Sequence, residues 1–304
     1  MPYFFLFIFG LAIGSFLNVV SLRYRPEQKL LDLKIIGGRS ACPHCQKTLR
    51  WYELIPLLSF IVQFGKCRSC GQRLSLQYPL VEILTGLIFV FVPYLLSSIL
   101  NSQFSILIAV WLLIFILFLL LSIIDFRHYI IPDSINLSLA VLGVVLIIFK
   151  SMGQWSVVSS QMSFLGHYAL LFDLPFFSIF DSSLFVDSDI IRNFASVIIN
   201  HLFAAIIAMA FFAAIIILTR GRAMGWGDFK LVGALGLIFG WPDILMIVFL
   251  SFIVGAVCVT PLLIRKQKTM KDAVPFGPFL IAGSALIFFF GYNIIDGYFK
   301  LFGL

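Results

Sequence analysis

The stretch FSILIAVWLLIFILFLLLSII, residues 104–124, contains no charged side chain and is followed directly by Asp125. Its length matches the ~20 apolar residues that an α-helix needs to cross the hydrocarbon core of a bilayer. A helix can do so because it satisfies its backbone hydrogen bonds internally. The stretch therefore predicts a transmembrane helix that ends on a carboxylate.

Comparable apolar runs recur along the chain, which is 61% hydrophobic and only 12% charged. A soluble domain has about 25% charged residues, so the polar surface needed in water is missing. We predict an all-α polytopic protein with about eight transmembrane helices in a lipid bilayer. The sixth candidate is short and is expected to pack with the seventh as a broken pair. The candidates are residues 3–22, 80–98, 104–124, 134–150, 195–218, 229–240, 243–264 and 277–296.

The basic residues predict the orientation in the membrane. The first span has no basic residue before it and no small-residue cleavage site, and Arg23 and Arg25 follow it directly. It is therefore expected to be a retained membrane anchor with its N-terminus outside, and not a cleaved signal peptide. With alternating spans, 18 of the 21 Lys and Arg residues fall on the cytoplasmic side. This is the positive-inside pattern, so the net charge of +7 indicates topology and not nucleic-acid binding.

A polar module between the first two spans carries four cysteines. CPHC at residues 42–45 and CRSC at residues 67–70 have nearly the spacing of a four-cysteine zinc ribbon. Gly71 can supply the tight turn after the second pair. Two disulfides are the alternative, but the reducing cytosol disfavours them. The pattern predicts one structural Zn²⁺ in a small cytosolic module, held by Cys42, Cys45, Cys67 and Cys70.

Two aspartates stand at the ends of predicted spans. Asp125 follows the stretch quoted above, and Asp228 precedes the short span in GRAMGWGDFKLVGALGLIFG, residues 221–240. A charged aspartate beside the bilayer is costly unless it faces water or a partner, so both are functional candidates. Simpler roles are open as well. Asp125 could pair with Arg127 or His128, and Asp228 could be the N-cap of the following helix.

The glycines around Asp228 favour a functional role. Gly225 and Gly227 remove side chains on both sides of Trp226, which would permit unusual dihedrals and close approach of another segment. Further glycines run down the predicted helix, where small residues permit close contact between helices. These are Gly233, Gly236 and Gly240.

If Asp125 and Asp228 meet, they can share one proton, because two like charges at short distance do not both ionise cheaply. The ionised carboxylate can take a proton from a water molecule while the protonated one polarises a peptide carbonyl. This chemistry hydrolyses a peptide without a metal or a nucleophilic side chain. Asp133 is the rival for the first position, but a helix cap after Pro132 explains it.

Five ordered motifs resemble those of the type IV prepilin leader peptidases, a family of membrane aspartic proteases. The resemblance implies that Asp125 and Asp228 are the catalytic pair, and we expect Gly225, Gly227 and Lys230 to support the active site. The motifs are GSFLNVVSLRYRP (14–26), the cysteine module with the following helix (42–86), IIDFRHYIIPD (123–133), GWGDFKLVGALG (225–236) and PFGP (275–278).

The resemblance also implies the substrates, which are precursors of type IV pilins and of type II secretion pseudopilins, cut after a short charged leader. Family members with the cysteine module usually also N-methylate the new N-terminus with S-adenosylmethionine. No dinucleotide-type glycine motif locates the methyl donor. Glu53 and Gly65 are the candidate methyl-transfer residues. Alternatively, Glu53 pairs with Arg50 or Lys66 and Gly65 only shapes its turn, and Glu82 is expected to pair with a basic residue.

The predicted protein is an inner-membrane endopeptidase with three parts: residues 1–22 as the first span, 23–78 as the zinc module and 79–304 as the peptidase domain, with an outer insertion at 151–194. Two other classes stay open. A proton-coupled transporter could use the membrane aspartates, but both acids lie at one face and no inverted repeat is seen. An assembly factor docking partners on the zinc module would not need the aspartates.

Overall fold

The structure, a computed structural model, describes residues 2–26, 37–100, 105–151, 189–222, 224–266 and 274–301. All eight predicted spans are α-helices, and strands are absent from these ranges except for two isolated β-bridges. Six of the helices are long and apolar enough to cross a membrane. The eight are α1 (Pro2–Arg23), α4 (Gln77–Leu100), α5 (Ser105–His128), α6 (Asp133–Ser151), α9 (Asp189–Leu218), α10 (Trp226–Phe239), α11 (Asp243–Ile264) and α12 (Gly277–Leu301).

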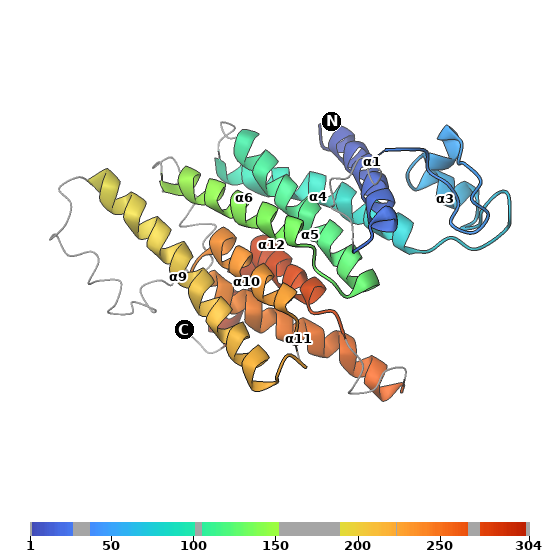
Figure 1. Ribbon diagram of the computed structural model, residues 1–304. Coiled ribbons are helices and arrows are strands. Elements are labelled where there is room, and N and C mark those ends of the chain that lie inside the picture. The colour runs from blue at the N-terminus through green and yellow to red at the C-terminus, as the bar shows by residue number, and fades with distance from the viewer. Residues whose placement is uncertain are drawn as a thin grey trace. The chain divides into compact units, whose positions relative to one another are not determined.

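The chain forms two compact units, Met1–His128 and Tyr129–Leu304, each considered by itself. The first contains α1, the cysteine module, α4 and α5, and the second contains α6 and α9 to α12 (Figure 1). The division into three parts by composition stays a prediction. Of the outer insertion, residues 152–188 lie outside the described residues.

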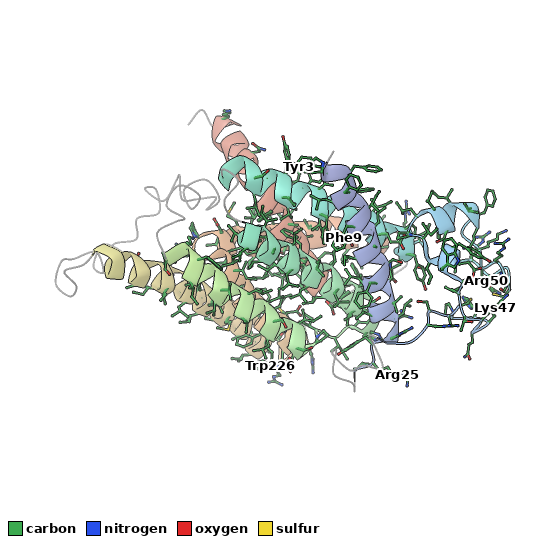
Figure 2. All side chains as sticks on the ribbon, turned by 90° about the horizontal axis from the view of Figure 1, so that it is seen from above. Tyr3, Phe9, Arg25, Lys47, Arg50 and Trp226 are labelled. Atoms are coloured by element: carbon green, nitrogen blue, oxygen red, sulfur yellow. The ribbon has the colours of Figure 1, made fainter. Side chains whose placement is uncertain are left out.

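In the first unit, α1 packs directly onto α4. A Cβ on Gly14 would lie only 2.8 Å from the Cα of Glu82, so the two backbones are in contact there. Small residues permit this close approach. In a membrane, where the hydrophobic effect does not drive helices together, such close packing stabilises their contact. The rings of Tyr3 and Phe9 (Figure 2) also pack against α4, on Tyr94 and Phe89. Other apolar side chains of α1 are exposed, as expected for contact with lipid: Phe4, Phe5 and Phe16.

In the second unit, the short helix α10 lies against α9 and α6. A Cβ on Gly236 would lie 2.5 Å from the Cα of Ala205 in α9, so the predicted glycine face is a helix–helix contact. The expected broken pair with α11 is wrong as a packing arrangement, because this face turns α10 towards α9. The turn between α10 and α11 is held by Asn200, whose amide exchanges two hydrogen bonds with the backbone of Trp241, at 2.9 and 3.0 Å.

Candidate active site and metal site

The four cysteines of the module meet at one point. Their Sγ atoms all lie within 4.8 Å of one another, and those of Cys42 and Cys70 are 4.0 Å apart. A tetrahedral ion with Zn–S bonds of ~2.3 Å sets its sulfurs about 3.8 Å apart, so the cluster is close to that geometry. All five cysteines of the chain are free thiols. The cluster could therefore hold a metal ion, as predicted.

The two cysteine pairs have nearly the same backbone. In each knuckle the first cysteine's carbonyl accepts a hydrogen bond from the residue four positions on: Gln46 N–H to Cys42 and Gly71 N–H to Cys67, both at 2.9 Å. Gly71 has φ +69° and confirms the predicted turn glycine, whereas Gln46 takes φ +56° with a side chain. Backbone N–H groups of Cys70 and Ser69 directed at the sulfur lower the pKa of Cys67 to about 6. They favour the thiolate of Cys67 that a metal ion requires. At Cys70 the backbone N–H of Gln72 acts in the same direction, but burial and the neighbouring cysteine side chains raise the pKa to about 11.

Asp125 lies in the last turn of α5, in the first unit, and is only 4% exposed. The two residues before it, Ile123 and Ile124, are also buried, so this end of α5 is packed. Three residues further on, the ring of His128 stacks edge-on against Tyr24 of the first unit, with centroids 5.9 Å apart. The aspartate is therefore held in packed structure and is not a solvated cap.

Asp228 lies in the first turn of α10, in the second unit, and is 8% exposed. It is not the N-cap residue. That position is Gly225, whose N–H donates to the Asp228 carboxylate at 3.4 Å. Gly225 has an ordinary extended conformation with φ −86°, so the expected unusual dihedral is absent there. The expected close approach is present at Gly227, where a Cβ would lie 3.0 Å from the Cβ of Ile131.

Lys230 and Asp133 form an ion pair that the sequence did not suggest. The lysine Nζ lies 2.7 Å from the carboxylate, and both side chains are largely exposed. Asp133 opens α6, as a residue of its first turn, so its position agrees with the expected role at a helix start. The two residues are 97 positions apart, which leaves no local pattern by which to find the pair.

Glu53 and Gly65 have clear local roles. Glu53 caps the start of the short helix η1 (Trp51–Leu54), because it accepts a hydrogen bond from the backbone N–H of the N-cap residue Arg50 at 2.8 Å. Its contact is with the Arg50 backbone and not the guanidinium. Gly65 has φ +65° and closes α3 (Leu58–Val62) through a 2.9 Å bond from its N–H to the Phe60 carbonyl. Their part in methyl transfer stays a prediction.

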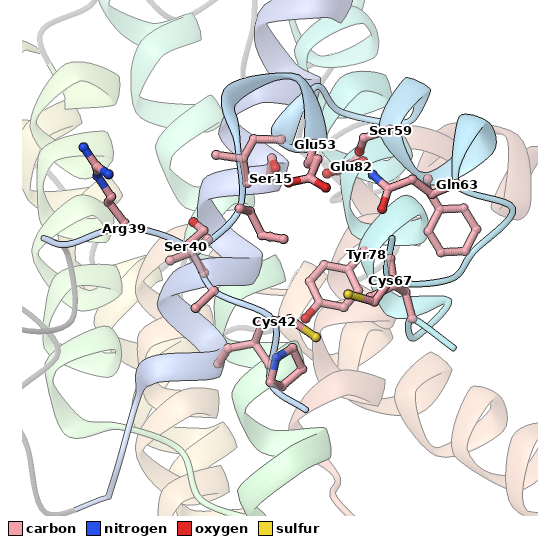
Figure 3. A pocket seen from close by; sticks show the side chains of 18 of the residues that line it. Ser15, Arg39, Ser40, Cys42, Glu53, Ser59, Gln63, Cys67, Tyr78 and Glu82 are labelled. Carbon is pink, nitrogen blue, oxygen red and sulfur yellow. The ribbon is translucent and has the colours of Figure 1, made fainter. Parts of the chain in front are cut away.

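A cavity of ≈ 320 Å³ lies in the first unit, between α1, the cysteine module, α4 and the end of α5. Figure 3 shows the carboxylates of Glu53 and Glu82 at one end of it, with Tyr78, Cys42 and Cys67 at the other. Glu82 is 6% exposed and accepts a hydrogen bond from the Leu57 N–H at 2.9 Å, so a backbone amide takes the place of the expected basic partner. The sequence separation of 25 hides this contact.

Comparison with known proteins gives one consistent family. Residues 8–96 match a model described as the bacterial peptidase A24 N-terminal domain, and residues 111–260 match the type IV leader peptidase family. Relatives named prepilin leader peptidase/N-methyltransferase include those of Bacillus subtilis, 30% identical over 97% of both chains, and Xanthomonas campestris, 31% identical over 97% of this chain and 93% of the relative. The protein of that name from Legionella pneumophila is 27% identical over 96% and 92%. No solved structure matches.

Proposed function

Because the chain belongs to the type IV leader peptidase family, we propose that it is a bifunctional enzyme of the bacterial inner membrane. It removes the charged leader from type IV prepilins and type II secretion pseudopilins, then N-methylates the new N-terminus. The observation that best supports the peptidase activity is the burial of two carboxyl groups, Asp125 and Asp228, each in a terminal turn of a helix.

Asp125 and Asp228 act as a coupled pair in this proposal. Burial disfavours two charged carboxylates at one place, so the pair carries one shared proton. The ionised member takes a proton from water, and the protonated member donates a hydrogen bond to the scissile carbonyl. Because the acids belong to α5 and α10, the reaction requires the termini of these two helices to meet around the substrate.

The predicted orientation places this chemistry at the cytoplasmic face. The N-terminus is outside, and the cysteine module and both aspartates are inside. A prepilin carries its charged leader just before an apolar helix, so its cleavage point lies where that helix leaves the membrane. Acids in the terminal turns of α5 and α10 suit cleavage at that level if each helix ends at the cytoplasmic face.

The peptidase proposal is tested with purified full-length protein in detergent and a prepilin substrate, whose mass is followed with time. Asp125→Asn and Asp228→Asn, each alone, should lower cleavage by about 10²–10⁴-fold or more, the usual contribution of a positioned acid or base. Asp133→Asn removes the same charge from a largely exposed ion pair and should cleave within a few-fold of wild type. Near-normal cleavage by either of the first two variants would exclude that residue from the mechanism.

We also propose that the metal of the cysteine module is zinc. Four thiolates at near-tetrahedral separations suit Zn²⁺, and four protein ligands leave no open position for catalysis. The ion would fold the module and not take part in cleavage. Metal analysis of a Cys42→Ser, Cys45→Ser double variant tests this, because the bound zinc should disappear. An unchanged zinc content would contradict the ribbon.

The methyl group is proposed to come from S-adenosylmethionine, which supplies an electrophilic methyl on a positively charged sulfur. Glu53 remains our candidate residue for methyl transfer, because it lines the cavity of the first unit. Gly65 is a candidate only because of the turn that it forms. Methylation is measured as a mass gain of the cleaved substrate when the donor is added. A cleaved product that is never methylated would restrict the enzyme to its peptidase activity.

A further inference from the structure

The cavity of the first unit is built around a strained turn. Leu57 has φ +60° and ψ −51°, and the N–H of Leu58 reaches the carbonyl of Pro56 at 2.6 Å. This is the three-residue γ-turn of positive φ, which is rare and strained for a residue with a side chain. Strain of this kind persists only where surrounding contacts hold it.

Glu82 is the side chain from α4 that binds this turn. Its carboxylate accepts the N–H of Leu57, the central residue of the turn, at 2.9 Å. Its own backbone cannot move aside, because α4 touches α1 at this level, with Gly14 leaving no room for a Cβ. A membrane helix and the cysteine module are thus joined at one buried carboxylate that also lines the cavity.

The cavity wall has the mixed chemistry of a small-molecule site. Its volume of ≈ 320 Å³ is within the range of about 300–1,000 Å³ for such sites. Two carboxylates, Glu53 and Glu82, lie at one end (Figure 3). Phe60, Tyr78 and Arg127 also line it.

We propose that this cavity binds S-adenosylmethionine, with Glu82 and Glu53 recognising its positive charges; this rests on the proposed methyltransferase function. The donor carries a sulfonium and an ammonium group, which the two carboxylates complement. Its adenine suits the aromatic side chains, and its carboxylate suits Arg127. The end formed by Glu53 and Glu82 offers no complementary charge to a neutral or anionic group, whereas the three arginines that line the cavity, Arg23, Arg39 and Arg127, complement the donor's carboxylate.

The test uses the full-length protein in nanodiscs and measures equilibrium binding of S-adenosylmethionine and of S-adenosylhomocysteine, which lacks the sulfonium charge. Glu82→Gln keeps an oxygen to accept the Leu57 N–H but removes the negative charge. It should weaken binding of S-adenosylmethionine at least tenfold and binding of S-adenosylhomocysteine less than threefold, while prepilin cleavage continues. Asp133→Asn, which loses the same charge in the second unit, should bind both compounds as wild type does.

Three results would overturn the assignment. Glu82→Gln binding both compounds like wild type would exclude Glu82, and equal weakening of both with intact cleavage would make it a purely structural residue. If Glu82→Gln does not fold, as judged by loss of cleavage and of metal, Glu53→Gln is tested instead. It should likewise weaken binding of S-adenosylmethionine more than binding of S-adenosylhomocysteine. Wild-type protein that cleaves but binds neither compound would refute the site and the methyltransferase activity together, and would leave the peptidase proposal intact.

Discussion

The close contact between α10 and α9 allows a quantitative prediction for Gly236→Ala. The new Cβ would lie 2.5 Å from the Cα and 2.6 Å from the N of Ala205. Carbon atoms in good contact are about 3.5–4.0 Å apart, so the two helices must separate by about 1 Å. Both obstructing atoms are backbone, and no rotamer change can relieve the clash.

This separation affects stability and activity differently. Overpacking of this degree costs about 1–3 kcal/mol, of which better helix propensity of alanine offsets up to about 1 kcal/mol. Asp228 lies two turns before Gly236 on the same helix, about 12 Å away, and moves with it. A displacement of about 1 Å at a catalytic group can lower the rate about 10²-fold. We therefore expect a 10- to 100-fold loss of cleavage with only a modest fall in Tm.

Gly255→Ala in α11 is the matched control. Its new Cβ would lie 3.2 Å from the ring of Phe279, a side chain that can give by a few tenths of an ångström. This variant should cleave within twofold of wild type. Prepilin cleavage rates and thermal unfolding in detergent are measured for both. If Gly236→Ala cleaves normally, or if Gly255→Ala is impaired as much, α10 packing does not position Asp228.

Three further outcomes are expected. The Lys230–Asp133 pair is largely exposed, so a double-mutant cycle with Lys230→Met and Asp133→Asn should give a coupling below about 1 kcal/mol; a larger value would show a buried role for the pair. Gln46→Gly should stabilise the module by up to about 1 kcal/mol, because it relieves a positive φ, while Gly71→Ala should destabilise it; equal unfolding midpoints would refute this. Chelation of the metal should open the cysteine module to limited proteolysis, and an unchanged digestion pattern would show that the module folds without an ion.

Much of the architecture could be predicted because its signals are local. The described residues of every predicted span lie within a helix, except for Gly240 directly after α10. A run of apolar residues is both the requirement for crossing a membrane and a visible pattern. The cysteine cluster was predictable for the same reason. Each C-x-x-C pair forms its own knuckle, and Gly71 marks the second turn.

The remaining features depend on contacts between distant parts of the chain. The sequence around Gly236 did not show whether this residue contacts α9 or α11. A row of glycines on a helix indicates that another helix packs closely, but it does not identify that helix. Glu82 looked like half of an ion pair, yet it binds the amide of a γ-turn that no residue preference predicts.

The sequence by itself determined the membrane class, the helices, the four-cysteine module and the choice of Asp125 and Asp228 as candidates. Hydrophobic length, cysteine spacing and the rarity of acids beside apolar runs are properties of neighbouring residues. Only the tertiary structure decided which helix faces α10, how Glu82 joins α4 to the module, and where a cavity forms. Each of these depends on side chains many positions apart competing for the same space, and such competition leaves no trace in a local pattern.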